Sequence, residues 1–242
     1  MRTVQAVAWK EIQVYFSSPT AYIVGLVFLV LTGVFFTQPL NDPFPPASIS
    51  SFLQGCTFIL IFLAPVLTMR LMAEEQKLGT IELLLTAPVR DWEVVLGKYL
   101  ACLVFLLALV ALTLYYPILL FAVGKGHPDL GPVLSGYLGL VLYGAASLSV
   151  GLLASTLTSN QIVAAVVAMG ILLMLYFLAI LSDKASGTLS VLSNIIGEVG
   201  IKSHFDDFDR GVIDTKHIIY YLSLTAIFIF LTIRTLELRR WR

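Results

Sequence analysis

Six long apolar stretches, separated by shorter polar segments, dominate the pattern of the chain. They cover residues 20–38, 51–69, 99–123, 133–154, 162–181 and 218–238. A helix rises about 1.5 Å per residue, so about 20 apolar residues are needed to cross a hydrocarbon core about 30 Å thick. The only charged residues inside these stretches are Arg234 and Glu237, near the end of the last one. The pattern predicts an all-α, polytopic membrane protein with six transmembrane helices in a single domain, residues 1–242.

The segment before the first stretch has a different pattern. Val4, Val7, Ala8, Ile12 and Tyr15 recur at helical spacing, and polar residues occupy other positions between them. This pattern favours an amphipathic helix lying in the membrane interface, with an ordinary soluble lead-in as the alternative. No small-residue cleavage site follows, so the segment is not predicted to be a signal peptide.

Composition supports the membrane setting and narrows the possible functions. The chain is 58% hydrophobic and 12% charged, whereas a soluble protein has about 25% charged residues. Charge this sparse argues against a water-soluble enzyme. Because 15 basic residues balance 15 acidic ones, no nucleic-acid partner is expected.

The distribution of Lys and Arg predicts the orientation of the helices. An even number of spans puts both termini on one side, and ten of the 15 basic residues lie on that side. These ten are Arg2, Lys10, Arg70, Lys77, Arg90, Lys98, Arg234, Arg239, Arg240 and Arg242. Because cytoplasmic loops carry the excess of positive charge, both termini are predicted to be cytoplasmic.

The chain carries no motif for catalysis or for nucleotide binding. It has no G-x-x-x-x-G-K-[ST], H-E-x-x-H, C-x-x-C or G-x-S-x-G sequence. The six stretches also hold no histidine, and ionisable groups at membrane depth are what embedded enzymes and ion-coupled transporters use. Cys56 and Cys102 are expected at opposite depths and should not pair. The sequence predicts no catalytic, cofactor-binding or metal-binding residues in this chain, so energy has to come from outside the membrane.

The loop between the second and third stretches, residues 70–98, carries most of the charge on the predicted cytoplasmic side. Gly79 is expected to end the helix that continues from the second span, and Thr80 is a suitable N-cap for a new one. Pro88 forbids its continuation, and Asp91 is expected to cap the helix that leads into the third span. The short helix is strongly apolar around residues 81–85, and such a surface beside water needs a cover. Lipid, the helix bundle and a protein partner are all possible covers.

This loop resembles a known family. The run PVLTMRLMAEEQKLGTIELLLTAPVRDWEVVLGKYLA is similar to the permease subunits of ABC transporters of the ABC-2 type, in which a run like EExxxGTxELLLTxPV forms a coupling helix. SNQIVAA at 159–165 is similar to the family's start of span five. The outer loop before the last span is similar to the gliding-motility-associated (Gld-type) permeases. The resemblance implies ATPase-coupling residues at Glu74, Glu75, Gly79, Thr80, Ile81, Glu82, Leu83, Leu84, Leu85 and Pro88.

The resemblance also implies partners and a function. A separate cytosolic ABC ATPase would bind ATP and Mg, so this chain itself needs no cofactor, and a second permease copy or a related chain would complete the pathway. The implied location is the inner membrane of a prokaryote, where membrane lipids surround the chain. An auxiliary membrane protein with a large outer domain is a further expected partner. The implied function is that of a transmembrane permease subunit of an exporter of an unidentified substrate. The alternative is an ATPase-driven membrane anchor or mechanotransmitter that acts on cell-envelope partners without transporting cargo.

Two further patterns lead to expectations about packing. Small residues recur four apart at Ser147, Gly151 and Ser155, which suits close packing of helices in lipid, or a surface that lines a cargo path. Pro65 and Pro117 lie inside predicted spans and are expected to kink their helices.

The segment before the last span predicts an outer amphipathic helix over 201–210. Its apolar positions are Ile201, Phe205, Phe208 and Val212, and the family resemblance makes them an outer gate helix. Gly211 is expected to end this helix and Asp214 to cap the last span. The polar residues His204, Asp206, Asp207 and Asp209 are interpreted as a solvated acidic face rather than a metal site.

Overall fold

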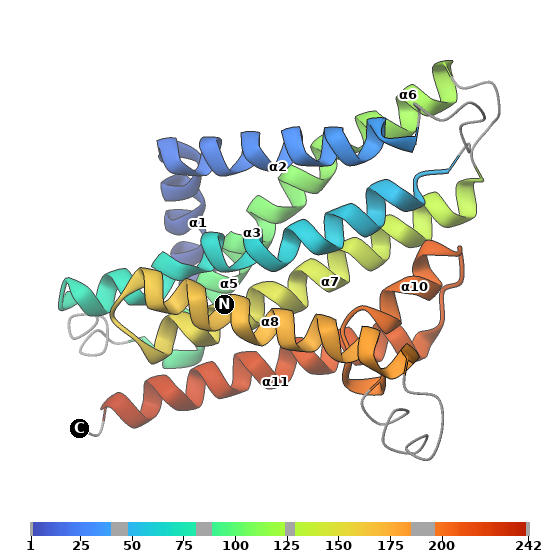
Figure 1. Ribbon diagram of the computed structural model, residues 1–242. Coiled ribbons are helices and arrows are strands. Elements are labelled where there is room, and N and C mark those ends of the chain that lie inside the picture. Colours follow the sequence, from blue (N-terminus) through green and yellow to red (C-terminus); the bar gives the residue numbers. More distant parts are fainter. Residues whose placement is uncertain (1, 40–47, 81–88, 124–128, 185–196, 241–242) are drawn as a thin grey trace, which may run out of the picture.

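A computed structural model describes residues 2–39, 48–80, 89–123, 129–184 and 197–240 (Figure 1). Nine helices lie wholly within these residues, which form no strand. They are α1 (Arg2–Ser17), α2 (Pro19–Thr37), α3 (Ser50–Lys77), α5 (Asp91–Thr113), α6 (Tyr115–Val123), α7 (Leu130–Leu157), α8 (Gln161–Lys184), α10 (Ser203–Asp209) and α11 (Thr215–Arg240). The expected all-α class is confirmed.

Six spans in this part of the chain are long and apolar enough to cross a membrane, as the sequence predicts. They are Pro19–Thr37, Ser50–Lys77, Asp91–Ala122, Leu130–Leu157, Gln161–Leu181 and Thr215–Leu238. The third combines α5 and α6. Each contains most of the stretch predicted from hydropathy, because the apolar length needed to cross a bilayer is a property of local sequence.

Helix α7 is the centre of the bundle and packs against α3, α5, α8, α10 and α11 (Figure 1). Its glycines let neighbouring helices approach closely. A Cβ atom on Gly151 would lie 2.1 Å from Thr68 Oγ1, and one on Gly144 would lie 2.5 Å from Leu106 Cδ2. The small-residue pattern of this span therefore serves packing within the chain.

The expected kink at Pro117 appears as a break between α5 and α6. Pro117 has no N–H to donate to the carbonyl of Thr113, four residues earlier. The Thr113 carbonyl instead accepts a hydrogen bond from the Tyr137 hydroxyl at 2.9 Å. Helix α3, in contrast, continues through Pro65 without a break.

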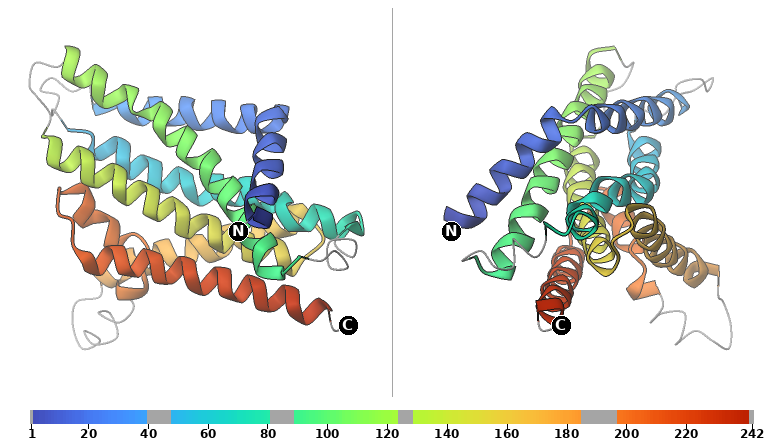
Figure 2. Two further views of the ribbon diagram at one scale, coloured as in Figure 1. Left: turned by 180° about the vertical axis from the view of Figure 1, so that it is seen from behind. Right: turned by 90° about the vertical axis from the view of Figure 1, so that its left-hand side faces the viewer.

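Helix α1 runs across one end of the long helices instead of alongside them (Figure 2). It packs on α5, where a Cβ atom on Gly97 would lie 2.8 Å from Val7. Trp9, on the opposite side of α1, is 63% exposed. The amphipathic helix predicted here is present, and its apolar face is used at least partly for contact with α5.

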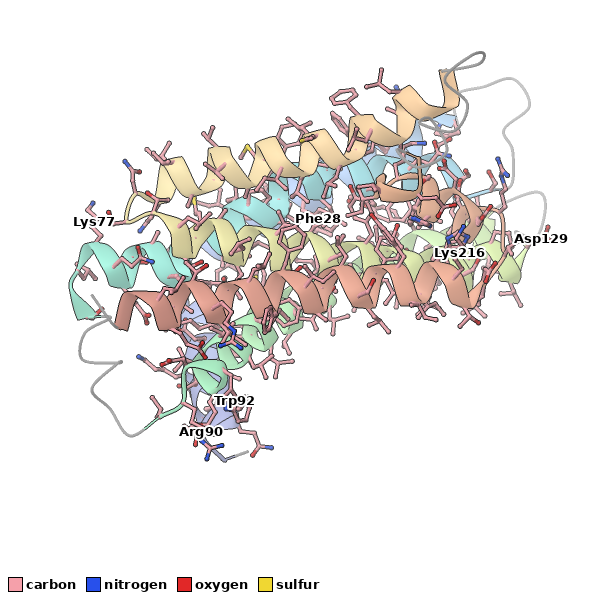
Figure 3. The ribbon with its side chains drawn as sticks, turned by 90° about the horizontal axis from the view of Figure 1, so that it is seen from below. Phe28, Lys77, Arg90, Trp92, Asp129 and Lys216 are labelled. Carbon is pink, nitrogen blue, oxygen red and sulfur yellow. The ribbon has the colours of Figure 1, made fainter. Side chains whose placement is uncertain are left out.

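The two ends of the bundle carry different sets of charged residues. Figure 3 shows Lys77, Arg90 and Trp92 towards one end and Asp129 and Lys216 at the other. Helix α1 and the C-terminal end of α11 lie at the end that holds Lys77 (Figures 1 and 3). We call this the α1 end and the opposite one the α10 end.

Candidate ATPase-coupling site and outer helix

Helix α3 extends well past the predicted span and forms the first arm of the candidate coupling site. Its 28 residues amount to about 42 Å of helix, about 12 Å more than a hydrocarbon core. The extension carries Glu74, which is exposed, and Glu75, which is half-buried. It ends at Gly79, whose φ of 71° is the left-handed conformation that favours glycine at a helix end.

The second arm is the start of α5. Asp91 is the first helical residue, and the residue in the N-cap position is Arg90, which corrects the prediction that Asp91 caps this helix. The carboxylate of Glu93 accepts a hydrogen bond from the Arg90 backbone N–H at 3.1 Å. Glu93 in the first turn also suits the positive end of the helix dipole.

Six of the ten predicted coupling residues lie outside the described residues. This applies to Ile81, Glu82, Leu83, Leu84, Leu85 and Pro88. Thr80 is the last residue described before them, and its hydroxyl donates to the Glu75 carbonyl at 3.3 Å. The structure therefore defines the two arms that carry this segment, and its coupling role stays a prediction.

A buried ion-pair network joins the two arms to α1. The Lys98 ammonium on α5 lies 2.7 Å from Glu11 Oε1 on α1 and 2.8 Å from Glu75 Oε1 on α3. Only 3% of the Lys98 side chain is exposed, against 13% for Glu11 and 20% for Glu75. A lysine this buried needs partners, because an unpaired charge in the interior is costly. We call these three residues the Lys98 network.

The extension of α3 is also held by α7. The Ser155 hydroxyl donates to the Met69 carbonyl at 2.9 Å and accepts from the backbone N–H groups of Met72 and Ala73, each at 3.1 Å. Gln76 Nε2 donates to the Thr156 carbonyl at 3.0 Å. The segment that leads to the coupling residues is therefore bonded to the central helix as well as to α5.

At the α10 end, the predicted outer helix is present but shorter and more buried than expected. Ile201, Phe205 and Phe208 are each 0% exposed, and α10 packs on α7. Val212 is exposed and lies beyond the helix, which ends at Asp209. The backbone N–H groups of Gly211 and Val212 bond to the Phe208 and Asp207 carbonyls, and Gly211 has a φ of 91°. This is the glycine-ended turn predicted at Gly211.

The start of the last span also agrees with the sequence prediction. Asp214 Oδ1 accepts a hydrogen bond from the Lys216 backbone N–H at 2.9 Å, in the first turn of α11. This satisfies one of the N–H groups left free at a helix start.

The interpretation of the polar residues on α10 as a solvated acidic face is wrong for part of the set. Asp209 is buried, and its Oδ2 accepts hydrogen bonds from Ser50 and from Gln54 Nε2 on α3. His204 is buried as well. Because α10 lies against the bundle, its polar side chains point partly inward and make tertiary contacts.

The buried histidines form a chain of contacts that sequence reasoning missed. His204 Nδ1 lies 2.7 Å from His217 Nδ1 on α11, and His204 Nε2 lies 3.0 Å from the Glu198 carbonyl. His217 Nε2 lies 2.8 Å from Asp207 Oδ2. We call His204, His217 and Asp207 the histidine network. The sequence offers one signal for this network, the predicted turn at Gly211, which folds α10 back towards α11.

The hydrogen-bond inventory of imidazole assigns the protons in this network. His204 must donate through Nε2 to the Glu198 carbonyl, so its Nδ1 accepts when the ring is neutral. His217 Nδ1 is then the donor to His204, and His217 Nε2 lies within hydrogen-bond distance of the Asp207 carboxylate. Burial lowers the pKa of His204, in keeping with a neutral ring.

Fold and sequence together define a multi-pass, all-helical membrane protein. Residues 44–236 match the family described as ABC-2 family transporter protein, and the chain belongs to this family. It is therefore a permease subunit of an ABC transporter, a class that works with an ABC ATPase and as a pair of permeases. A search of curated proteins finds no match.

Proposed function

We propose that this chain couples ATP hydrolysis by a separate cytosolic ATPase to the export of a substrate, and that residues 74–88 receive the ATPase. The observation that supports this most directly is the Lys98 network, because it joins both arms of the segment and α1 at one point. A segment held in this way can pass a displacement to the membrane helices instead of bending on its own.

The path of the displacement follows from the contacts. A push on residues 80–85 moves the end of α3, which continues as one helix into the membrane. Ser155 and Gln76 bond that end to α7, the helix that packs against most of the bundle. The stroke therefore reaches the central helix through two turns of α3, and through Lys98 it also reaches α5 and α1.

The proposal includes an orientation and a set of partners. The α1 end, which carries Arg70, Lys77 and Arg90, faces the cytoplasm, in line with the excess of positive charge expected there. Both termini are then cytoplasmic and the membrane is the inner one. A second permease completes the pathway, ATP and Mg bind to the ATPase, and the outer-loop likeness to Gld-type permeases supports an auxiliary subunit with a large outer domain.

Co-purification with an ABC ATPase tests this proposal. The chain is co-expressed with candidate ABC ATPases from the same genome and isolated in detergent, as wild type and as Leu84→Asp. We expect robust recovery of the ATPase with the wild type and a loss of at least tenfold with Leu84→Asp, because a charge in an apolar contact removes its burial energy.

The matched control is Ile162→Asp, which adds the same charge at a 73% exposed apolar residue in the first turn of α8, at the same end. It should leave recovery unchanged. Equal recovery with wild type and Leu84→Asp would mean that residues 81–85 rest on lipid, and the coupling proposal would be withdrawn.

A further inference from the structure

A cavity of about 390 Å³ lies at the α1 end, where α1, α2, α3 and the start of α8 meet. One part of its lining is polar, with Arg70, Thr20 and Glu74. The other part is apolar, with Ile23, Val24, Val66 and Leu67 among its residues. A lining that is polar and charged on one side and apolar on the other suits an amphipathic ligand.

Arg70 is the cation of this cavity and is held in place by its neighbours. Its Nη1 donates to Ser18 Oγ and to Thr20 Oγ1, each at 3.2 Å, and its guanidinium lies 5.0 Å from the Tyr15 ring centre. Tyr15 is itself fixed by its hydroxyl, which donates to the Leu67 carbonyl at 2.7 Å. Among the described residues no carboxylate forms an ion pair with Arg70, so its charge remains available to an anion.

The position of the cavity selects lipid as the occupant. Ser18 and Thr20 stand at the start of the α2 span, and Arg70 follows the predicted end of the second span, so the polar part lies at headgroup depth. The apolar part continues onto the outer face of α2, where Ile23 is 62% exposed. An exposed apolar face at this depth in a membrane protein suits contact with acyl chains.

Glu74 indicates which headgroup fits. It lies one helical turn beyond Arg70, which is about 6 Å along the axis, and it lines the same cavity. A phosphate at Arg70 therefore has a carboxylate beside it. A headgroup that carries its own cation next to the phosphate matches this pair, whereas an anionic headgroup with a neutral alcohol leaves Glu74 unmatched.

We propose that this cavity binds a phosphatidylethanolamine molecule of the adjacent leaflet. Arg70, Ser18 and Thr20 hold the phosphate, Glu74 accepts hydrogen bonds from the ammonium group, and one acyl chain lies along Ile23 and Val66. The lipid fills the angle between α1 and α2 and so supports α1. This inference rests on the membrane setting. It shares Glu74 with the segment proposed to receive the ATPase, and lipid binding to the chain without an ATPase tests it separately from the coupling proposal.

Native mass spectrometry of the full chain, loaded with lipids of equal acyl chains, tests the assignment. Phosphatidylethanolamine and phosphatidylglycerol are compared on the wild type, Arg70→Gln, Glu74→Gln and Thr20→Val. We expect Arg70→Gln to weaken both lipids about tenfold and Thr20→Val to weaken them about threefold to fivefold, as for loss of charged and neutral hydrogen bonds. Glu74→Gln should weaken phosphatidylethanolamine alone.

Two controls separate this site from general lipid adhesion. Arg234→Gln removes an exposed arginine of α11 that pairs with Glu237, and it should leave lipid retention unchanged. Soluble glycerophosphoethanolamine should compete only weakly, because it lacks the acyl chain. Equal retention by the wild type and Arg70→Gln, or an equal loss with Arg234→Gln, would overturn the site. Equal effects of Glu74→Gln on both lipids would overturn the choice of headgroup, and full competition by the soluble headgroup would overturn the lipid.

Because Arg70 also contacts Tyr15, its variant can lose stability. Thr20→Val keeps the size of an exposed side chain and serves as the second, milder variant. Unchanged lipid retention in a well-folded Thr20→Val protein would likewise count against the site.

Discussion

The α1 end and the α10 end are both held by buried polar networks, but the two networks differ in chemistry. The Lys98 network joins α1, α3 and α5 through one ammonium group and two carboxylates. The histidine network joins α10 to α11 through two imidazoles and one carboxylate. Imidazole is the side-chain type whose ordinary pKa lies within the physiological pH range, between about pH 5 and 8.

This difference separates two mechanical tasks. The Lys98 network ties together three helices around the segment proposed to receive the ATPase, so it should remain closed while a stroke passes through it. The histidine network fastens a seven-residue helix to the last span, and its bonds depend on where protons lie. The Lys98 network therefore suits a contact that stays closed, and the histidine network suits a contact that a change in pH weakens.

The largest expected effect comes from breaking the Lys98 network. Lys98→Met leaves Glu11 and Glu75 as facing carboxylates without a cation, and breaking a buried pair in this way costs about 3–5 kcal/mol. Thermal unfolding in detergent measures it. Lys77→Met, at an exposed lysine of the same end, is the control and should change stability by less than about 0.5 kcal/mol.

A second substitution sharpens this test. Adding Glu75→Gln to Lys98→Met should restore part of the lost stability, because it removes one of the stranded charges. A Lys98→Met protein as stable as the wild type would show that the α1 end does not depend on its ion pairs.

The next effect concerns α7, the helix that both ends share. Gly151→Ala places a Cβ atom against Thr68 Oγ1, so α3 and α7 must move apart at a cost of about 1–3 kcal/mol. Gly170→Ala on α8 is the matched control, since a Cβ atom there meets nothing within 4 Å. It should be neutral or slightly stabilising.

The measurement is again thermal unfolding in detergent, on both variants in parallel. If Gly151→Ala and Gly170→Ala behaved alike, close packing at the α3–α7 contact would not be what holds the centre of the bundle.

The smallest effect is the pH response of the α10 end. Burial lowers the pKa of His204 in the folded protein, so the stability that His204 contributes is present above its unfolded pKa of about 6.5. That stability is lost as the pH falls, because folding must then expel a proton. Hydrogen exchange of residues 203–217 is compared at pH 7.5 and pH 5.0. After correction for the intrinsic exchange rate at each pH, protection should be lower in acid.

The variant His204→Gln should lose most of this acid response, since glutamine does not titrate. The other ionisable groups around the network, His217, Asp207, Glu198 and Lys216, remain in the variant and serve as an internal control. An equal acid response in wild type and variant would mean that His204 does not set the pH dependence of this end.

Local patterns were sufficient to predict the long helices and some of their limits. The six spans follow from apolar length, and the turns at Gly79 and Gly211 follow from the left-handed backbone that glycine tolerates. The family, too, was recognisable from one cytoplasmic run. The residues of that run from Ile81 to Pro88 remain a prediction, because they lie outside the described part of the chain.

Tertiary structure alone decided which polar residues meet. Lys98 pairs with residues 87 and 23 positions away, and His204 meets His217 only because α10 turns back against α7 and α11. Val212, assigned to the apolar face by its spacing, lies beyond the helix end and is exposed. Hydropathy and helical spacing are properties of neighbouring residues, whereas the partner of a buried charge is set by how separate helices pack, and that information is spread over the whole chain.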